Sequence, residues 1–180
     1  MSKAIVFLAD GLEECEGLLV VDILRRGGVE VTTASVNGST KVVSSHGITL
    51  FADTPAEDAD YESADLLVLP GGKKGTENLA ASAFVRQRCA EFAAGKKVAA
   101  ICAAPSILAS IGLLKGKKAT VHPQFEDKMP DACLTHLPVT VAGNITTGQA
   151  LGAAIPFALE LLRQLEGEEK VARVRKGICF

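Results

Sequence analysis

The feature that most constrains the fold of this chain is a regular alternation of short apolar runs with longer amphipathic stretches. Apolar runs bounded by turn residues are typical of buried strands, and the stretches between them carry apolar residues at helical spacing. The predicted strands cover residues 4–8, 29–34, 65–69, 98–101, 119–121, 139–141 and 145–147, with a strand pair at an edge within residues 42–51. The predicted helices cover residues 13–26, 82–94, 103–111, 152–165 and 168–175. Such alternation favours an α/β fold with a mostly parallel sheet covered by helices on both faces.

Length and composition restrict the organisation and the partners of the chain. Its 180 residues suit a single domain over 1–180, without an internal repeat or a linker. The net charge is -2 and there is no basic patch of the kind that neutralises phosphates, so we expect no nucleic-acid partner. The first apolar run ends at residue 9 and no run approaches the length of a membrane span, so we expect neither a secretory signal nor a membrane partner.

The cysteines indicate a reducing compartment. There are five of them, widely spaced and without a C-x-x-C pair. This pattern predicts neither a disulfide framework nor a zinc site. We therefore expect a cytoplasmic protein without a metal.

One cysteine stands where catalytic residues of α/β sheets are found, just beyond the carboxyl end of a strand. Cys102 lies between the apolar run 98–101 and a predicted helix with Pro105 in its first turn. A sharp strand-to-helix turn lifts a side chain out of the sheet, and a helix N-terminus favours thiolate over thiol. A buried cysteine that acts as a small apolar residue is the alternative. The position favours a reactive Cys102 with a lowered pKa.

An acid and a histidine are expected at the same edge of the sheet. Glu16 begins the apolar face of the first helix, so it should point inward, where burial and a nearby thiolate would raise its pKa. An ordinary acid in the first turn of a helix is the alternative. His122 follows the strand 119–121 and could act as a general base or pair with the thiolate, although a lone histidine in a loop is more often structural.

The glycines after the third strand suggest a place for substrate oxygen. Gly71 and Gly72 let the backbone approach closely, so that the N–H groups of Gly72 and Ala103 could form an oxyanion hole. Simple turn glycines are the alternative. The segment Gly71-x-x-x-Gly75 is no phosphate loop, because it lacks the Lys-Ser/Thr ending and a following helix pattern.

With these residues in view, the chain resembles the ThiJ/PfpI superfamily, and in particular the branch of the parkinsonism-associated deglycase. The resemblance covers nearly the whole length. It is carried by ADGLEECE (9–16), VDILRRGG (21–28), LVLPGG (67–72), AAICAAP (99–105), HP (122–123) and DKM (127–129). No single segment is specific, but the combination is.

The resemblance implies a flavodoxin-like three-layer sandwich, a domain similar to class I glutamine amidotransferases, and a homodimer that uses the first helix. It also implies a nucleophile at Cys102, a protonated Glu16 bonded to its sulfur, His122 nearby, and backbone donors at Gly72 and Ala103. No cofactor is implied.

The chain departs from relatives at several positions. The protease-like branch has a histidine directly after the nucleophile, where this chain has Ala103. Near the pocket, His46 and Gln149 stand where arginines are expected, and Leu151 stands where a proline is expected. These departures weigh against a peptidase and leave anion binding beside the cysteine open.

Three functions are compatible with this pattern. The first is a cysteine-dependent, cofactor-independent enzyme on a small aldehyde or glycated substrate, which converts methylglyoxal to lactate or reverses early protein adducts. The second is a redox sensor or holdase chaperone in which Cys102 oxidises to a sulfinate. The third, intracellular peptide hydrolysis, is the weakest.

Overall fold

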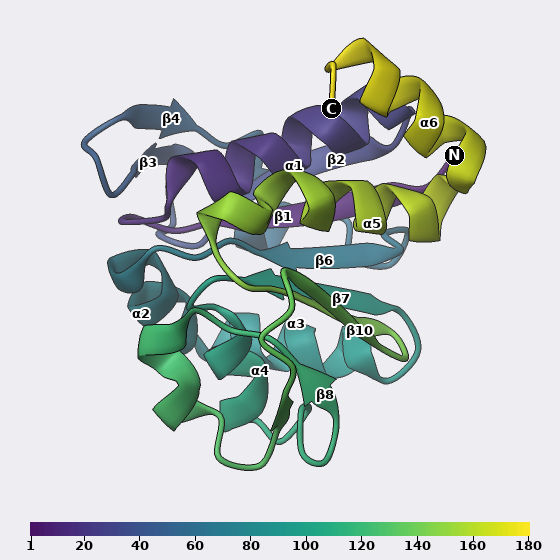
Figure 1. The fold of residues 1–180 in the computed structure, drawn as a ribbon. Helices are drawn as coiled ribbons and strands as arrows, with labels where there is room; N and C mark the ends of the chain where they lie inside the picture. The colour runs from purple at the N-terminus through teal and green to yellow at the C-terminus, as the bar shows by residue number, and fades with distance from the viewer.

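The computed structural model describes residues 1–180 as a three-layer sandwich with a central sheet (Figure 1). The sheet has the strand order β10-β11-β7-β6-β1-β2-β5, and every pair is parallel except β10 with β11. Its strands are β1 (Lys3–Leu8), β2 (Glu30–Ser35), β5 (Thr54–Pro55), β6 (Leu66–Leu69), β7 (Lys97–Ile101), β10 (Val139–Ala142) and β11 (Ile145–Gly148). This confirms the predicted flavodoxin-like fold with a mostly parallel sheet.

Helices cover both faces of the sheet (Figure 1). One layer holds α1 (Glu14–Gly27), α5 (Ala154–Glu166) and α6 (Glu168–Gly177). The other holds α2 (Lys73–Ala81), α3 (Ala83–Ala93) and α4 (Pro105–Ser110). Short 3-10 turns lie at η1 (Ala56–Asp58), η2 (Pro123–Lys128) and η3 (Leu151–Ala153). None of the helices is both long enough and apolar enough to cross a bilayer.

Two small sheets lie outside the central one. The hairpin of β3 (Lys41–Val43) and β4 (Thr49–Phe51) is the expected strand pair within residues 42–51. The other pair, β8 (Lys118–Ala119) with β9 (Cys133–Leu134), is parallel.

Strand β1 shows why the sheet is buried on both faces. Ala4, Val6 and Leu8 belong to the apolar core beneath α1 and α5, whereas Ile5 and Phe7 belong to the core on the opposite face. Successive side chains of a strand point to opposite faces, so a continuous apolar run fills both cores at once.

One helix, α2, was not predicted from the sequence, and another, α4, was predicted to be longer than it is. Helix α2 follows directly after Gly72, where no helix pattern was recognised, because its only large apolar residue inside the core is Leu79 and the rest of its buried face is Gly75 and Thr76. The predicted helix over 103–111 is reduced to α4, which begins at Pro105. The predicted helix over 152–165 begins later, as α5 at Ala154 after the turn η3, so that Pro156 lies in its first turn.

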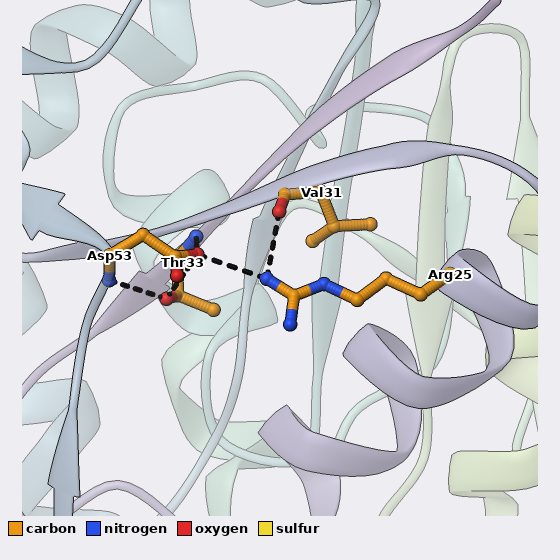
Figure 2. A network of polar contacts seen from close by, with 4 residues as sticks. All are labelled: Arg25, Val31, Thr33 and Asp53. Carbon is orange, nitrogen blue, oxygen red and sulfur yellow. Dashed lines mark hydrogen bonds and ion pairs between the residues drawn. The ribbon is translucent and has the colours of Figure 1, made fainter.

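A polar network connects the end of α1 to the edge of the sheet (Figure 2). The Arg25 guanidinium donates to the carbonyl of Val31 at 2.9 Å and to Asp53 Oδ2 at 3.0 Å. The same carboxylate oxygen accepts from the backbone N–H and the hydroxyl of Thr33, both at 2.8 Å. The network therefore fixes α1, β2 and the segment that leads into β5 relative to one another.

The order of the strands brings three segments together at one edge. Strand β6 lies between β1 and β7, with Val6 beside Val68 and Leu69 beside Ala100. The segments that leave the carboxyl ends of these strands are the start of α1, the Gly71-Gly72 turn and Cys102. Ligand sites of open α/β sheets form at such an edge.

Candidate active site

Cys102 has a backbone conformation that side-chain-bearing residues rarely adopt. Its φ is 64°, in the left-handed region. Two hydrogen bonds hold this conformation: the Cys102 N–H donates to the carbonyl of Gly148 at 3.0 Å, and its carbonyl accepts from the N–H of His122 at 2.9 Å. Strained residues of this kind cluster at functional sites, where the surrounding structure compensates for their cost. The expected sharp turn at Cys102 is present.

Glu16 lies on the buried face of α1 and reaches the cysteine. The residue is 1% exposed. Its Oε2 accepts from the N–H of Gly71 at 3.1 Å, whereas the buried Oε1 has no nitrogen or oxygen partner. The side chain that meets this carboxyl group is the Cys102 thiol. The acid is therefore turned inward, toward the sulfur.

Glu16 is placed by the residue that caps its helix. The carboxylate of Glu13, the N-cap of α1, accepts from the backbone N–H of Glu16 at 2.7 Å. The N–H of Glu13 in turn donates to the carbonyl of Gly71 at 3.0 Å. The start of α1 and the turn after β6 are thus held together by two bonds, one from Glu13 to Gly71 and one from Gly71 to Glu16.

The two glycines after β6 are required by the close packing of this site. A Cβ on Gly71 would lie 2.4 Å from Glu16 Oε2 and 2.5 Å from Cys102 Cβ. Gly72 has a φ of 86°, and a Cβ there would meet the backbone of Gly11 and Glu13 at 2.5 and 2.4 Å. Any side chain at either position would force the acid, the cysteine and the α1 start apart.

The backbone N–H groups of Gly72 and Ala103 lie close enough to the Cys102 sulfur to oppose the rise of its thiol pKa. They were predicted as donors to a substrate oxygen, and the structure brings both of them to Cys102. Groups that stabilise negative charge on sulfur are also within reach of an oxyanion formed next to it.

The acid and the thiol change each other's ionisation. Burial, partly offset by the bond to Cys102, raises the pKa of Glu16 to about 7. Burial and the charge of an ionised Glu16 raise the pKa of Cys102 to about 12, against the opposing effect of the two backbone donors. The lowered thiol pKa expected from the helix N-terminus is therefore wrong for the thiol beside an ionised Glu16. The two groups titrate as a pair that carries one negative charge above about pH 7.

His122 is connected to Cys102 through the backbone rather than through its ring. Its Nδ1 accepts from the N–H of Gln124 at 3.2 Å, and the ring packs edge-on against Phe125. No hydrogen bond of the ring reaches the sulfur. With Nδ1 engaged as an acceptor, Nε2 is the nitrogen left for substrate.

Two residues, His46 and Gln149, were not predicted from the sequence to be site residues. His46, in the β3–β4 hairpin, contacts Glu14 Oε1 through Nδ1 at 2.7 Å. Burial opposes ionisation of Glu14, but bonds from its backbone N–H, Ser44, His46 and Ser45 lower its pKa to about 2. Gln149 donates to the carbonyl of His136 at 3.4 Å. No local pattern could reveal the His46 contact, because 32 residues separate it from Glu14.

Comparisons with known proteins agree with this fold. The family model described as the DJ-1/PfpI family matches residues 2–164. Protein dj-1beta of Drosophila melanogaster is 36% identical over 182 residues, covering 99% of this chain and 97% of that protein. Its crystal structure superimposes with a TM-score of 0.96 over 99% of this chain and 98% of that one, at 36% identity. The glutathione-independent glyoxalase DJR-1.2 of Caenorhabditis elegans is 28% identical over 182 residues, covering 99% and 96% of the two chains. This chain belongs to the DJ-1/PfpI family.

Proposed function

We propose that the protein is a cysteine-dependent enzyme that converts small α-oxoaldehydes such as methylglyoxal to 2-hydroxy acids without a cofactor. The observation that carries this proposal is the Cys102 sulfur held between the Glu16 carboxyl group and the N–H groups of Gly72 and Ala103. A glyoxalase among the relatives supports it. Family membership establishes a DJ-1-type function, and the particular reaction is our inference.

The first step is addition of sulfur to the aldehyde. The reactive form of the pair has its proton on Glu16 and its charge on Cys102, since the sulfur has two N–H donors and Glu16 Oε1 has no nitrogen or oxygen donor. A carbon–sulfur bond forms, and the carbonyl π electrons move to oxygen. That oxygen takes up a proton from Glu16 and becomes the hydroxyl of a hemithioacetal.

The second step moves hydrogen between the two carbons. Glu16, which lost its proton in the first step, removes the proton from the carbon bonded to sulfur and returns it to the neighbouring carbon by way of an enediol. The Nε2–H of His122 can donate to the neighbouring carbonyl oxygen, because Nδ1 already accepts a hydrogen bond. The first carbon is thereby oxidised to a thioester and the second reduced to an alcohol, so no external oxidant is needed. Water then cleaves the thioester, releasing lactate and the Cys102 thiol. The same addition would reverse early glycation adducts on protein thiols and amines.

The test follows lactate formation from methylglyoxal without glutathione. Cys102→Ser should lower the rate by at least about a thousandfold, because the nucleophile is lost. The matched control is Cys133→Ser, an exposed cysteine in β9 that should leave the rate unchanged. If His122 donates to the substrate, His122→Ala should slow turnover by about a hundredfold. Full activity in Cys102→Ser would contradict the proposal.

Oxidation of Cys102 is the second candidate function, favoured by one contact. A protonated Glu16 beside the sulfur can donate to a sulfinate oxygen, which would stop oxidation at that stage. One peroxide converts the thiol to a sulfenic acid and a second converts that to the sulfinic acid, each releasing water. Absence of lactate from the wild type, with accumulation of sulfinate at Cys102 under mild peroxide, would favour this function.

A further inference from the structure

A group of side chains that could bind a metal ion lies at the start of α1, separate from the Cys102–Glu16 pair. Glu13, Glu14 and His46 each present one potential ligand atom, and these three atoms lie within 4.8 Å of one another. Two carboxylates and an imidazole form a mixed donor set of the kind that binds first-row transition ions. We propose that this group, called here the hairpin site, binds a divalent transition-metal ion.

The backbone holds the hairpin site together. The N–H of Gly11 donates to the carbonyl of Val43 at 2.7 Å, and the N–H of Ser45 donates to the carbonyl of Leu12 at 2.8 Å. These two bonds tie the β3–β4 hairpin to the segment that leads into α1. An ion would therefore meet ligands that are already in position and would not have to collect them from mobile loops.

The charge of the hairpin site also suits a divalent cation. The two carboxylates carry two negative charges, and no lysine or arginine forms an ion pair with either of them. Their only possible cationic partner is His46. Its Nδ1 lies 2.7 Å from Glu14 Oε1, and the ring is a cation only when it is protonated. Three protein ligands would leave at least one coordination position open to water.

The chain contains an internal control for this proposal. His136 also contacts a carboxylate, with its Nδ1 3.2 Å from Glu126, but there is no second acid in that group. If an exposed histidine beside a single acid were sufficient, both sites would bind equally. The hairpin site should bind the ion more tightly because it supplies a third ligand.

The test uses tag-free full-length protein carrying Cys15→Ser and Cys102→Ser, which removes the thiol nearest the hairpin site in the chain and the thiol of the active site as competing ligands. Titration with Ni²⁺ in a calorimeter should show one ion per chain. His46→Gln and Glu13→Gln should each weaken binding by at least about tenfold, since losing a direct ligand costs no less than losing a supporting group. His136→Gln should leave affinity unchanged. His46 is 70% exposed, so its replacement should not unfold the chain.

Nuclear magnetic resonance identifies the ligand directly, because the chain has only three histidines. Substoichiometric Ni²⁺ should broaden the imidazole signals of His46 before those of His122 and His136. Absence of binding would overturn the proposal, as would binding that survives His46→Gln, or equal broadening at all three histidines. None of these readouts depends on enzymatic activity, so failure here is distinguishable from failure of the proposed function.

Discussion

At the scale of single residues, the site depends on a proton shared between Glu16 and Cys102. Both groups are withdrawn from water. Glu16 raises the cost of ionising Cys102, whereas the bond from Cys102 only partly offsets the cost of ionising Glu16. The acid therefore keeps its proton to a higher pH than an exposed carboxyl group, and the first proton lost near neutrality leaves a single charge on the pair. Burial, rather than the helix N-terminus, sets the ionisation of this site.

Alkylation of Cys102 should report this shared proton. In the wild type, the rate of labelling by iodoacetamide should rise with a midpoint of about pH 7, where the pair loses its first proton. In Glu16→Gln no acid is available to ionise first, so the midpoint should move to higher pH. Mass spectrometry of the Cys102 peptide separates its rate from those of the other four cysteines. An unchanged midpoint in the variant would show that Glu16 does not control the thiol.

The raised pKa of Glu16 also makes a prediction for stability. Its value is about 7 in the folded protein against an ordinary 4.5, so the folded state binds more protons between these values and stability falls as pH rises through that window. Above about pH 7 the cost is on the order of 3 kcal/mol. Glu16→Gln should therefore be stabilised relative to wild type at pH 8 and lose that advantage at pH 4. Urea unfolding at both pH values measures the difference; a gap independent of pH would argue against a buried acid.

At the scale of elements, the two ends of α1 have different tasks. Its N-terminal turn places Glu16 at Cys102, whereas its last turn is fixed to the sheet edge through Arg25 and Asp53 (Figure 2). Burial opposes ionisation of Asp53, but bonds from Thr33 and the charge of Arg25 lower the pKa of its carboxyl group.

Removing the Asp53 carboxylate should destabilise the protein in a pH-dependent way. Because the folded pKa is lowered, the stabilisation is present above the ordinary value of 3.8 and is lost as pH falls through the folded value. Asp53→Ala should cost about 1–2 kcal/mol at pH 7, since the buried Thr33 N–H loses its acceptor, and less at pH 2. Asp22→Ala removes an exposed ion pair with Arg26 and should cost under about 0.5 kcal/mol. Equal costs for the two variants in denaturant unfolding would contradict this.

At the scale of the whole molecule, some apolar side chains remain outside both cores. Leu18 on α1 is 42% exposed, and Phe51 on the neighbouring hairpin is 72% exposed. We propose that the chain forms a homodimer through this side of α1, because a symmetric contact would bury the same apolar side chains on both copies.

A charge on α1 should disrupt that assembly. Light scattering coupled to gel filtration should give the dimer mass for the wild type and a shift toward monomer for Leu18→Glu, in which each interface would bury an uncompensated carboxylate. Leu137→Glu introduces the same charge at an exposed leucine before β10 and should remain dimeric. A monomeric wild type at micromolar concentrations would contradict the proposal.

The sequence by itself determined most strands of the sheet, most of the helices and the position of Cys102, because apolar periodicity and turn residues act locally. It did not reveal the short edge strand β5. Nor did it reveal α2, whose buried face relies on Gly75 and Thr76 where an apolar stripe would have marked a helix. Whether Glu16 was an ordinary helix-start acid or a partner of the cysteine also stayed open. Neighbouring residues alone could not decide between them.

Only the tertiary structure decided these points, because they depend on contacts between distant segments. It places Glu16 against Gly71 and Cys102, connects His122 to the cysteine through its backbone, and joins His46 to Glu14. The ionisation of Glu16 and Cys102 follows from burial among these segments, and burial is a property of the packed molecule. The position of Cys102 could thus be predicted locally, whereas the ionisation of its thiol is set by the fold.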